Sequence, residues 1–346
     1  MPVSDVTFRT LPFEQCADIV ANFRNTQREA QRDAAYFHWR YVQRPSGLPA
    51  YVTLGFDAAG QAVAAASLIP HDFSISGTLE KAGMVGDVSV SESMRGRGLA
   101  ARLIAQLRDD AFGRGLAACF VLPNKELTGA LTRNGFQTVG AIRRAIRLLR
   151  MRGRLQRRLG RAGGVAGALL DGVLRTVANF QDGRLPASFS TATPATFDTR
   201  YDALWAHVPR SGLCLARRDS RWLTWRFTEK PGGHYRIFEL RRGNELAGYV
   251  VHHREDDLVY VDDFLAGDVE AADVLGRAFA VAARDGAWGD AIQVRYVEQP
   301  VEAGAIPLPF AGRYLLRADS QAVMWVAREG VPQARRWYVT PADKDV

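Results

Sequence analysis

The stretch that decides the fold spans residues 86–100 and reads GDVSVSESMRGRGLA. Residues 84–90 are mostly apolar, as expected of a buried strand. A helix is expected from Leu99 to about Phe112, because apolar residues recur there at helical spacing on one face. The stretch therefore predicts a strand, a glycine-rich turn and a helix in direct succession.

This turn has the properties of an anion site. Backbone N–H groups at the start of a helix converge on one point, which also feels the positive end of the helix dipole. Gly96 and Gly98 let the backbone approach a ligand closely. Arg95 and Arg97 add positive charge. We therefore predict a site for a pyrophosphate or a similar dianion.

Two other phosphate-binding motifs do not fit this turn. A P-loop requires Gly-x4-Gly-Lys-Ser/Thr, which the stretch lacks. A dinucleotide fingerprint requires a third glycine, and Ala101 stands in its place. The remaining pattern, RGRGLA at residues 95–100, resembles the acyl-CoA signature Q/R-x-x-G-x-G/A of the GNAT (GCN5-related N-acetyltransferase) superfamily. Asn124 and the pair Gly135-Phe136 follow in the order familiar there, so the resemblance covers about residues 50–150.

The resemblance implies an α/β fold with a mixed, mostly antiparallel sheet flanked by helices. It implies acetyl-CoA as acyl donor, transfer of the acetyl group to a primary amine, and no metal. The backbone around Val88 and Val90 is expected to pair with the pantetheine arm, and Asn124 to hydrogen-bond it. The cofactor-binding residues implied by the resemblance are Val88, Ser89, Val90, Arg95, Gly96, Arg97, Gly98, Leu99, Ala100 and Asn124.

The same resemblance points to Asp87 as the catalytic base, because many members keep an acidic residue at this strand position. An architectural role is the alternative, since Asp262 and Asp263 occupy the corresponding place in the second half of the chain. The usual acid of the superfamily is a tyrosine, and Leu131 stands at its position. Tyr36, Tyr41 and His71 are the substitutes considered for that acid.

An internal repeat indicates that the chain carries one scaffold twice. Residues 32–47 and 218–233 share the ungapped pattern R-D-x-x-aromatic-apolar-x-W-R-aromatic-x-x-basic-P-x-G. A predicted hairpin follows each copy, at residues 50–68 and 235–252. Further on, the second half is expected to have a strand at 258–265, a helix at 270–285 and a strand at 291–297. The Trp-Arg pairs within the repeats are interpreted as anchors, with tryptophan in the core and arginine at the surface.

The second half lacks the glycine-rich turn. Its strand and helix are joined by Gly267-Asp268-Val269-Glu270, whose two carboxylates would repel a pyrophosphate. We therefore predict an active GNAT domain at residues 1–150 and a degenerate GNAT-like domain at 187–346. The second domain is expected to complete the substrate cleft or to form a homodimer contact.

Residues 151–186 are predicted to form a basic helical linker. The segment 143–162 contains nine arginines and no acidic residue. A solvated connector is one interpretation, and a peripheral contact with an anionic membrane surface is the other.

Composition bounds the class of protein. The chain has 346 residues, a net charge of +8 and 47% hydrophobic residues, which suits two globular domains and an anionic ligand. Cys16, Cys119 and Cys214 form no Cys-x-x-Cys pair, which fits a reducing compartment, and Cys119 is read as a small core residue. Without a targeting signal or a run of ~18 apolar residues, the protein is expected to be cytoplasmic, with the inner membrane face as an alternative site.

Two functions follow from these features. The first is an N-acetyltransferase acting on an amino sugar or peptide amine, because the tandem arrangement and basic linker resemble GNAT-like proteins of envelope polysaccharide assembly. The second is a non-catalytic module that senses acyl-CoA or another nucleotide and docks at a membrane. The expected partner is a small-molecule amine or sugar, with no nucleic acid. The acceptor, the acyl chain length, the general acid and the oligomeric state stay open.

Overall fold

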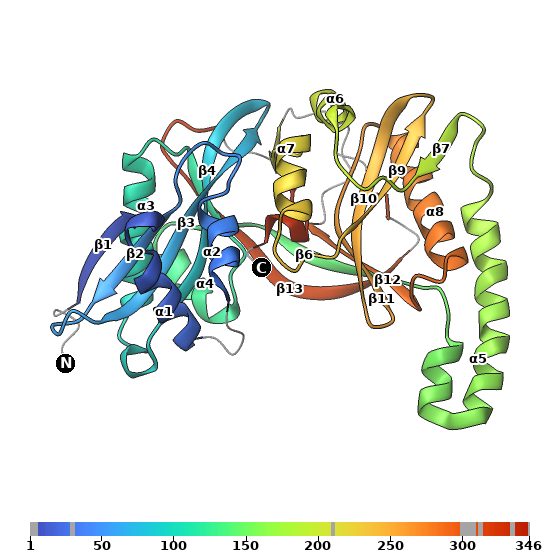
Figure 1. The fold of residues 1–346 in the computed structure, drawn as a ribbon, viewed down its shortest axis with the longest axis horizontal. Coiled ribbons are helices and arrows are strands. Elements are labelled where there is room, and N and C mark those ends of the chain that lie inside the picture. Colours follow the sequence, from blue (N-terminus) through green and yellow to red (C-terminus); the bar gives the residue numbers. More distant parts are fainter. Residues whose placement is uncertain are drawn as a thin grey trace.

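The computed structural model describes residues 6–27, 32–208, 212–297, 309–310, 314–332 and 336–344. Within these residues the strands form one 14-stranded sheet with helices on both of its faces (Figure 1). Most neighbouring strands run antiparallel, and three pairs run parallel. The predicted class, a mixed and mostly antiparallel sheet flanked by helices, is confirmed.

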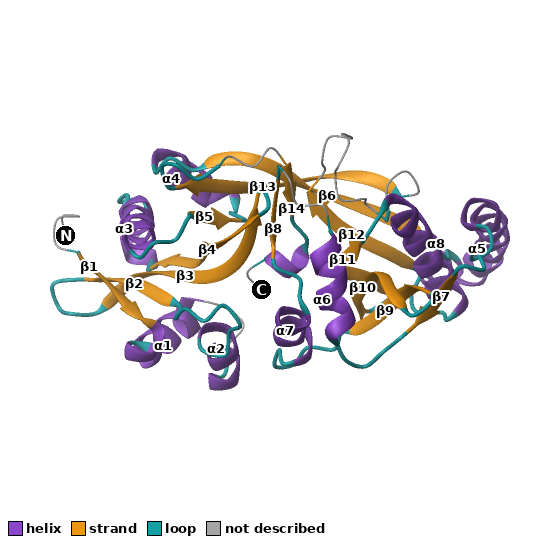
Figure 2. Cartoon of the chain, turned by 90° about the horizontal axis from the view of Figure 1, so that it is seen from above, coloured by secondary structure: helices purple, strands orange, loops and turns teal. Residues whose placement is uncertain are grey.

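The first half of the chain builds one end of this sheet. Its strands are β1 (Thr7–Pro12), β2 (Tyr51–Phe56), β3 (Ala62–Ile75), β4 (Thr78–Val90), β5 (Ala118–Val121) and β6 (Gln137–Leu148). Its helices are α1 (Ala17–Gln27), α2 (Ala34–Tyr41), α3 (Leu99–Gly113) and α4 (Lys125–Arg133), with short 3-10 turns η2 (Phe13–Gln15) and η3 (Glu92–Met94). Figure 2 shows α1 and α2 on one face of the sheet and α3 and α4 on the other. The predicted apolar face of α3 is buried against β3 and β4.

The second half repeats this order of elements. Its strands are β7 (Phe189–Ala192), β8 (Leu213–Ala216), β9 (Arg236–Arg242), β10 (Glu245–Glu255), β11 (Leu258–Ala266), β12 (Ala291–Val297), β13 (Leu315–Ala327) and β14 (Arg336–Tyr338). Its helices are α6 (Thr199–His207), α7 (Ser220–Leu223) and α8 (Val269–Asp285), with a π-helical turn η4 (Thr224–Thr228) and a 3-10 turn η5 (Pro341–Asp343). In both halves a hairpin leads to a strand, a helix and a parallel strand, which are β4, α3 and β5 in one and β11, α8 and β12 in the other.

The two halves exchange strands at the centre of the sheet. The order is β1-β2-β3-β4-β5-β13-β6-β12-β11-β10-β9-β7, with β8 on β3 and β14 on β8. Strand β13 of the second half therefore pairs with β5, and β6 of the first half pairs with β12. Separating the halves would expose the edges of both strands. Strand β6 is one long strand held between β13 and β12. The division into two domains stays a prediction.

The repeated segments meet at a local twofold arrangement. The rings of Trp39 and Trp225 stack with their centroids 5.1 Å apart. Each indole N–H donates to the other residue's carbonyl oxygen, at 2.7 Å and 3.1 Å. Arg44 lies over the Trp225 ring, and its repeat counterpart Lys230 lies over the Trp39 ring. Because every contact is reciprocated, the repeat in the sequence corresponds to a repeat in space.

The arginines of the two Trp-Arg pairs are not at the surface. Arg40 and Arg226 are 4% and 5% exposed, because both lie where the two halves press together. The surface part of the anchor interpretation is therefore wrong, although both tryptophans are buried as expected. The repeated aspartates have a simple role, since Asp33 and Asp219 cap the helices that carry these pairs.

The linker segment forms helix α5 (Arg152–Asp182), which is kinked at Gly160. The short arm before the kink folds back on the long arm, and the hairpin projects from the body (Figure 1). The arms touch so closely that a Cβ on Gly163 would lie 2.2 Å from the carbonyl oxygen of Leu155. At its base the helix is held by an ion pair between Arg147 and the buried Asp182, 2.6 Å apart.

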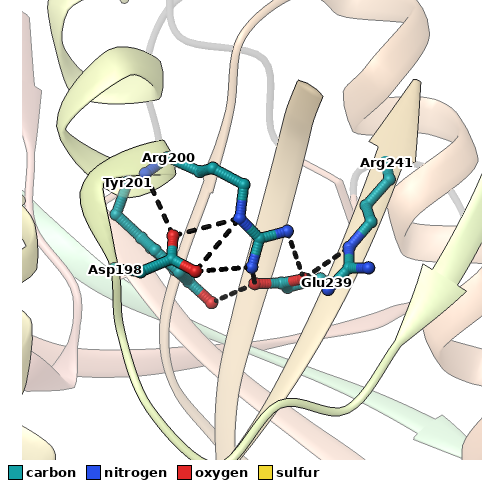
Figure 3. Close-up of polar contacts among 5 residues, drawn as sticks. All are labelled: Asp198, Arg200, Tyr201, Glu239 and Arg241. Carbon is teal, nitrogen blue, oxygen red and sulfur yellow. Dashed lines mark hydrogen bonds and ion pairs between the residues drawn. The ribbon is translucent and has the colours of Figure 1, made fainter. Parts of the chain in front are cut away.

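A second ionic cluster fixes α6 to the sheet of the second half. Figure 3 shows the fully buried Glu239 of β9 between Arg200 of α6 and Arg241. Tyr201 donates its hydroxyl to the same carboxylate at 2.9 Å, and burial together with Glu239 raises the pKa of Tyr201 far above its ordinary value. Asp198 caps α6 and holds Arg200 in place. A buried carboxylate needs such partners, so this cluster is structural.

Candidate functional site

The parallel strands β4 and β5 separate and leave a cleft between them. They pair only where residues 82–84 face residues 118–120. Beyond Met84, β4 continues along β3 to Val90 without a partner on its β5 side. A cavity of about 770 Å³ opens there, between the ends of the two strands, the start of α3 and helix α4.

The turn between β4 and α3 forms one end of this cavity. Gly96 and Gly98 have φ angles of 74° and 77°, in the left-handed region that favours glycine. A Cβ on either residue would meet nothing within 4 Å, so the space above the turn is open. Gly98 is the N-cap of α3, and within the described residues no capping side chain accepts a hydrogen bond from this helix start. A helix start of this kind can bind an anion.

The structure brings the residues expected at the cofactor around this one cavity. Of the ten residues implied by the resemblance, all except Arg97 line it. Arg95 is exposed, and its Nε donates to the carbonyl oxygen of Val90 across the turn. Asn124 accepts a hydrogen bond from the amide of Leu127 and thereby caps α4. This residue therefore has a structural role in addition to the cofactor contact implied by the resemblance.

Three further residues at the cavity were not expected from the sequence. Arg133, on α4, adds a positive charge to the wall opposite the turn. Gln321 and Lys344 come from the second half of the chain. Gln321 donates to the carbonyl oxygen of Leu122 at 3.2 Å, which ties β13 to the end of β5. The long sequence separation of these two residues left no local pattern that would have revealed them.

Asp87 lies at the cavity wall but is held by the protein itself. It sits in a β-bulge of β4 with a φ of 52°, where two residues oppose Ala66. Its carboxylate is 2.8 Å from Nη1 of Arg24 and 3.1 Å from Nε of Arg40. The hydroxyl of Tyr41 donates to the same carboxylate. The corresponding Asp263 is also buried and pairs with Arg218, Tyr249 and Thr340.

None of the three substitutes for the missing acid lines the large cavity, and Leu131 is fully buried in the core. Tyr36 packs among aromatic rings, and Tyr41 is committed to Asp87. His71 lies in a neighbouring small cavity that also includes Met84. Cys119 is a core residue as predicted, and burial raises the pKa of its thiol to about 12.

The part of the chain that the structure describes contains no group of three or more His, Cys, Asp or Glu side chains placed to hold a metal ion. It also contains no helix that is long and apolar enough to cross a bilayer.

Comparison with known proteins agrees with this geometry. The model of the acetyltransferase (GNAT) domain matches residues 7–138. No curated protein sequence matches the chain. The similar solved structures include a conserved protein of unknown function from Enterococcus faecalis V583, at 9% identity with a TM-score of 0.66. GCN5-related N-acetyltransferases from Anabaena variabilis and Kribbella flavida follow, at 10% and 15% identity with TM-scores of 0.62 and 0.59.

These three structures cover 92–94% of this chain, and the chain covers 72% of each. At such low identity they establish a shared fold that includes both halves. The matched residues include the open turn and the elements β4 to α4 around it. This chain therefore carries a GNAT acetyltransferase domain, which residues 7–138 form.

Proposed function

We propose that the chain transfers an acetyl group from acetyl-CoA to a primary amine within the cleft between β4 and β5. The observation that carries the proposal is the uncapped N-terminus of α3 at the mouth of a 770 Å³ cavity. The amides around Gly96 and Gly98 suit the pyrophosphate, with Arg95 and Arg97 beside them. The unpaired edge of β4 at Val88 and Val90 suits the pantetheine arm, which would extend the sheet as a strand does.

The nucleophile in this reaction is the neutral amine. The amine nitrogen attacks the thioester carbonyl carbon, the C–S bond breaks, and CoA leaves as a thiolate that takes up a proton. The attacking nitrogen loses one proton as the amide forms. Starting from an ammonium ion, the products are the amide, CoA thiol and one released proton.

Two roles remain for Asp87 in this scheme. As a base, it would accept the amine's proton through water. As a positioning residue, it would hold Arg24 and Arg40 and fix the bulge that shapes the cleft. The two guanidinium partners favour the positioning role, because the carboxylate already neutralises them. An Asp87→Asn variant separates the roles, since loss of a base lowers kcat at unchanged folding stability, whereas loss of an ion-pair partner lowers the melting temperature.

The proposal is tested by measuring release of free thiol from acetyl-CoA over a panel of amines that includes amino sugars and amino acids. Wild type is expected to turn over at least one of them, and Gly98→Asp to show no turnover, because a carboxylate would fill the anion site. Gly60→Asp is the matched control, since Gly60 has the same φ of 77° and equally open space above it. Equal activity in both variants would contradict the proposal. Amino sugars of envelope polysaccharides are the acceptors suggested by the tandem arrangement.

A second function is favoured by the surface of α5. Its long arm exposes Val165, Leu169, Val173 and Val177, which are spaced four residues apart and share a face, and Phe180 is 93% exposed. The arginine-rich short arm packs against the long arm at Gly163, Gly164 and Gly167. We propose that the α5 hairpin docks on an anionic lipid surface, where apolar burial and arginine attraction act together. A second copy of the chain would instead bring the two basic arms together.

Vesicle flotation tests this docking. Wild type is expected to float with vesicles containing phosphatidylglycerol and to stay unbound with phosphatidylcholine alone. Substituting Arg152, Arg154 and Arg158 by glutamine, or Leu169 and Phe180 by serine, is expected to abolish flotation. Flotation of these variants at the wild-type level would contradict docking, as would a dimer in sedimentation that Phe180→Ser dissolves. If the protein binds acetyl-CoA and vesicles but turns over no amine, the result supports a non-catalytic acyl-CoA-sensing module and contradicts the acetyltransferase function.

A further inference from the structure

Lysine is rare in this chain. Of its 45 lysine and arginine residues, four are lysines, namely Lys81, Lys125, Lys230 and Lys344. An arginine side chain stays protonated, whereas the amine of a lysine can lose its proton and become a nucleophile. The four lysines are therefore the side-chain amines available for stable acylation, and their surroundings determine how they react.

The four lysines lie in different surroundings. Lys81 is neutralised by an ion pair with Asp72, and Lys125 is exposed at the start of α4. Lys344 lines the large cleft. Lys230 differs from these three, because it is half-buried at the contact between the two halves of the chain.

The ammonium group of Lys230 lies among aromatic rings. It donates a hydrogen bond to the hydroxyl of Tyr235 at 2.9 Å. It also lies 5.5 Å from the centroid of the Tyr235 ring and 5.9 Å from that of the Trp39 ring. No carboxylate of the described residues forms an ion pair with Lys230, and the nearby Asp262 accepts a hydrogen bond from Nδ1 of His253 at 2.6 Å. Aromatic rings attract a cation without neutralising it.

The charges that act on Lys230 come from both halves, and most of them are positive. Arg226 belongs to the same segment as Lys230, while Arg32 and Arg40 belong to the first half. Asp262 of β11 acts in the opposite direction, since its negative charge favours the ammonium form. Like charges disfavour the protonated form of an amine. The cluster therefore favours loss of the proton from Lys230.

Burial is the largest cause of this shift, and the charge of Arg226 comes next. Together with the other neighbours they lower the pKa of Lys230 to about 8. At pH 7.5 about one in four Lys230 amines is then neutral, compared with about one in a thousand for an ordinary lysine. The neutral amine is the form that attacks a carbonyl carbon. Lys230 thus combines a reactive amine with a side chain that is still half open to solvent.

The repeat shows that packing alone does not require a lysine at this position. Arg44 is the counterpart of Lys230 in the first copy, and it lies over the Trp225 ring as Lys230 lies over the Trp39 ring. A guanidinium makes the same kind of ring contact without supplying a nucleophilic amine. The contact between the halves therefore carries an amine on one side only.

We propose that Lys230 is an acylation site of this chain, at which an acyl thioester such as acetyl-CoA reacts with the side-chain amine. The neutral nitrogen attacks the thioester carbonyl carbon, and the C–S bond breaks. The leaving thiolate takes up the proton that the nitrogen loses, so the products are an amide and a free thiol. This reaction goes beyond transfer in the cleft, because it modifies the chain itself. It removes a positive charge from the contact between the halves.

Site-resolved mass spectrometry tests this site with S-acetyl-N-acetylcysteamine, a small thioester that lacks the nucleotide of CoA. At pH 7.5 wild type is expected to acetylate Lys230 at least about tenfold faster than the exposed Lys125, because more of the Lys230 amine is neutral. Gly98→Asp is expected to keep this ratio, since the reagent does not use the turn of α3. A ratio near one in wild type, or its loss in Gly98→Asp, would overturn the proposal. Preferential labelling without turnover of any free amine retains this site and rejects only the proposed function.

The pH dependence of labelling separates a shifted amine from simple accessibility. Labelling of Lys230 is expected to level off near about pH 9, where its amine is mostly neutral. Labelling of Lys125 is expected to keep rising to about pH 10, as for an ordinary lysine. Parallel rises of both lysines up to pH 10 would overturn the proposal.

Substitutions of Arg32 test the neighbouring charge without changing the buried contact. Arg32 lies over the Tyr36 ring at the edge of this cluster. Arg32→Gln and Arg32→Glu are expected to slow Lys230 labelling at pH 7.5 in that order, by about twofold for the larger change, because each raises the pKa of Lys230. Arg175→Glu makes an equal change of charge on the exposed surface of α5 and is expected to leave labelling unchanged. Equal rates in wild type and Arg32→Glu, or equal slowing by Arg175→Glu, would overturn the role of the cluster.

Discussion

Helices α3 and α8 begin at equivalent places in the two halves, but their N-termini are capped differently. In α8 the side chain of Asp268 accepts a hydrogen bond from the amide of Ala271, and Arg242 forms ion pairs with both Asp268 and Glu270. In α3 the N-cap is Gly98, which has no side chain, and the amides face an open cavity. The chain itself caps α8, whereas no side chain of the described residues caps α3. The two copies of the scaffold thus differ at this helix start, which is open in the first copy and carries two carboxylates in the second.

The largest losses of unfolding free energy are expected when the buried aspartate of either half is substituted. Asp263→Asn leaves Arg218 uncompensated in the core, and Asp87→Asn does the same to Arg24 and Arg40. Each variant is expected to lose about 3–5 kcal/mol of unfolding free energy, as when one partner of a buried pair is removed. Urea unfolding measures this loss, with the exposed Asp285→Asn as control. If Asp87→Asn is as stable as wild type, the carboxylate of Asp87 is not needed for stability and is free for catalysis. The two halves would then differ in the role of their buried aspartates.

Acid is expected to destabilise both halves through buried neutral histidines. Burial lowers the pKa of His252 to about 3, and that of His71 well below its ordinary value. Between those values and about pH 6.5 the unfolded chain binds protons that the folded chain does not, so stability falls as the pH falls. Each histidine contributes a slope of about 1.4 kcal/mol per pH unit in this window.

Unfolding free energies measured between pH 7.5 and 5 test this slope. His252→Phe keeps a ring to stack on Trp288 and is expected to remove one histidine's share of it. An unchanged acid slope in this variant would mean that His252 is protonated in the folded protein.

The arginines near the two helix starts are expected to differ in their effect on acetyl-CoA affinity. Arg95→Ala removes a charge at the open turn of α3 and is expected to weaken binding about tenfold. Arg242→Ala removes a charge at the capped turn of α8 and is expected to leave binding unchanged. Fluorescence titration of both variants gives the two dissociation constants. Equal losses would mean that the protein's general positive field, rather than the turn of α3, attracts the ligand.

The sequence predicts the local features of this site well and the non-local ones poorly. The strand, turn and helix of residues 86–100 are set by neighbours in the chain, so their apolar spacing and glycines were sufficient. The insertion of β13 beside β5 and the arrival of Gln321 and Lys344 at the cavity depend on pairing between distant segments. The burial of Arg226 also depends on how the halves meet. Its sequence context matches that of Arg40, while its partners do not.

The smallest expected effect concerns the cap of α8. Asp268→Ala removes the hydrogen bond to the amide of Ala271 and is expected to cost about 1 kcal/mol of unfolding free energy. The variant is not expected to bind a second acetyl-CoA, because Glu270 keeps a carboxylate in the first turn of α8, where it would repel a pyrophosphate. Thermal unfolding measures the first effect, and titration checks the second. A second binding event in Asp268→Ala would show that the cap alone separates the two halves.

The central claim is that one helix start in this chain, that of α3, receives acetyl-CoA. Isothermal titration of wild type, Gly98→Asp and Gly60→Asp with acetyl-CoA tests it most directly. We predict one site per chain in wild type and in Gly60→Asp, and no measurable binding in Gly98→Asp. Two sites in wild type, or unchanged binding in Gly98→Asp, would contradict the account.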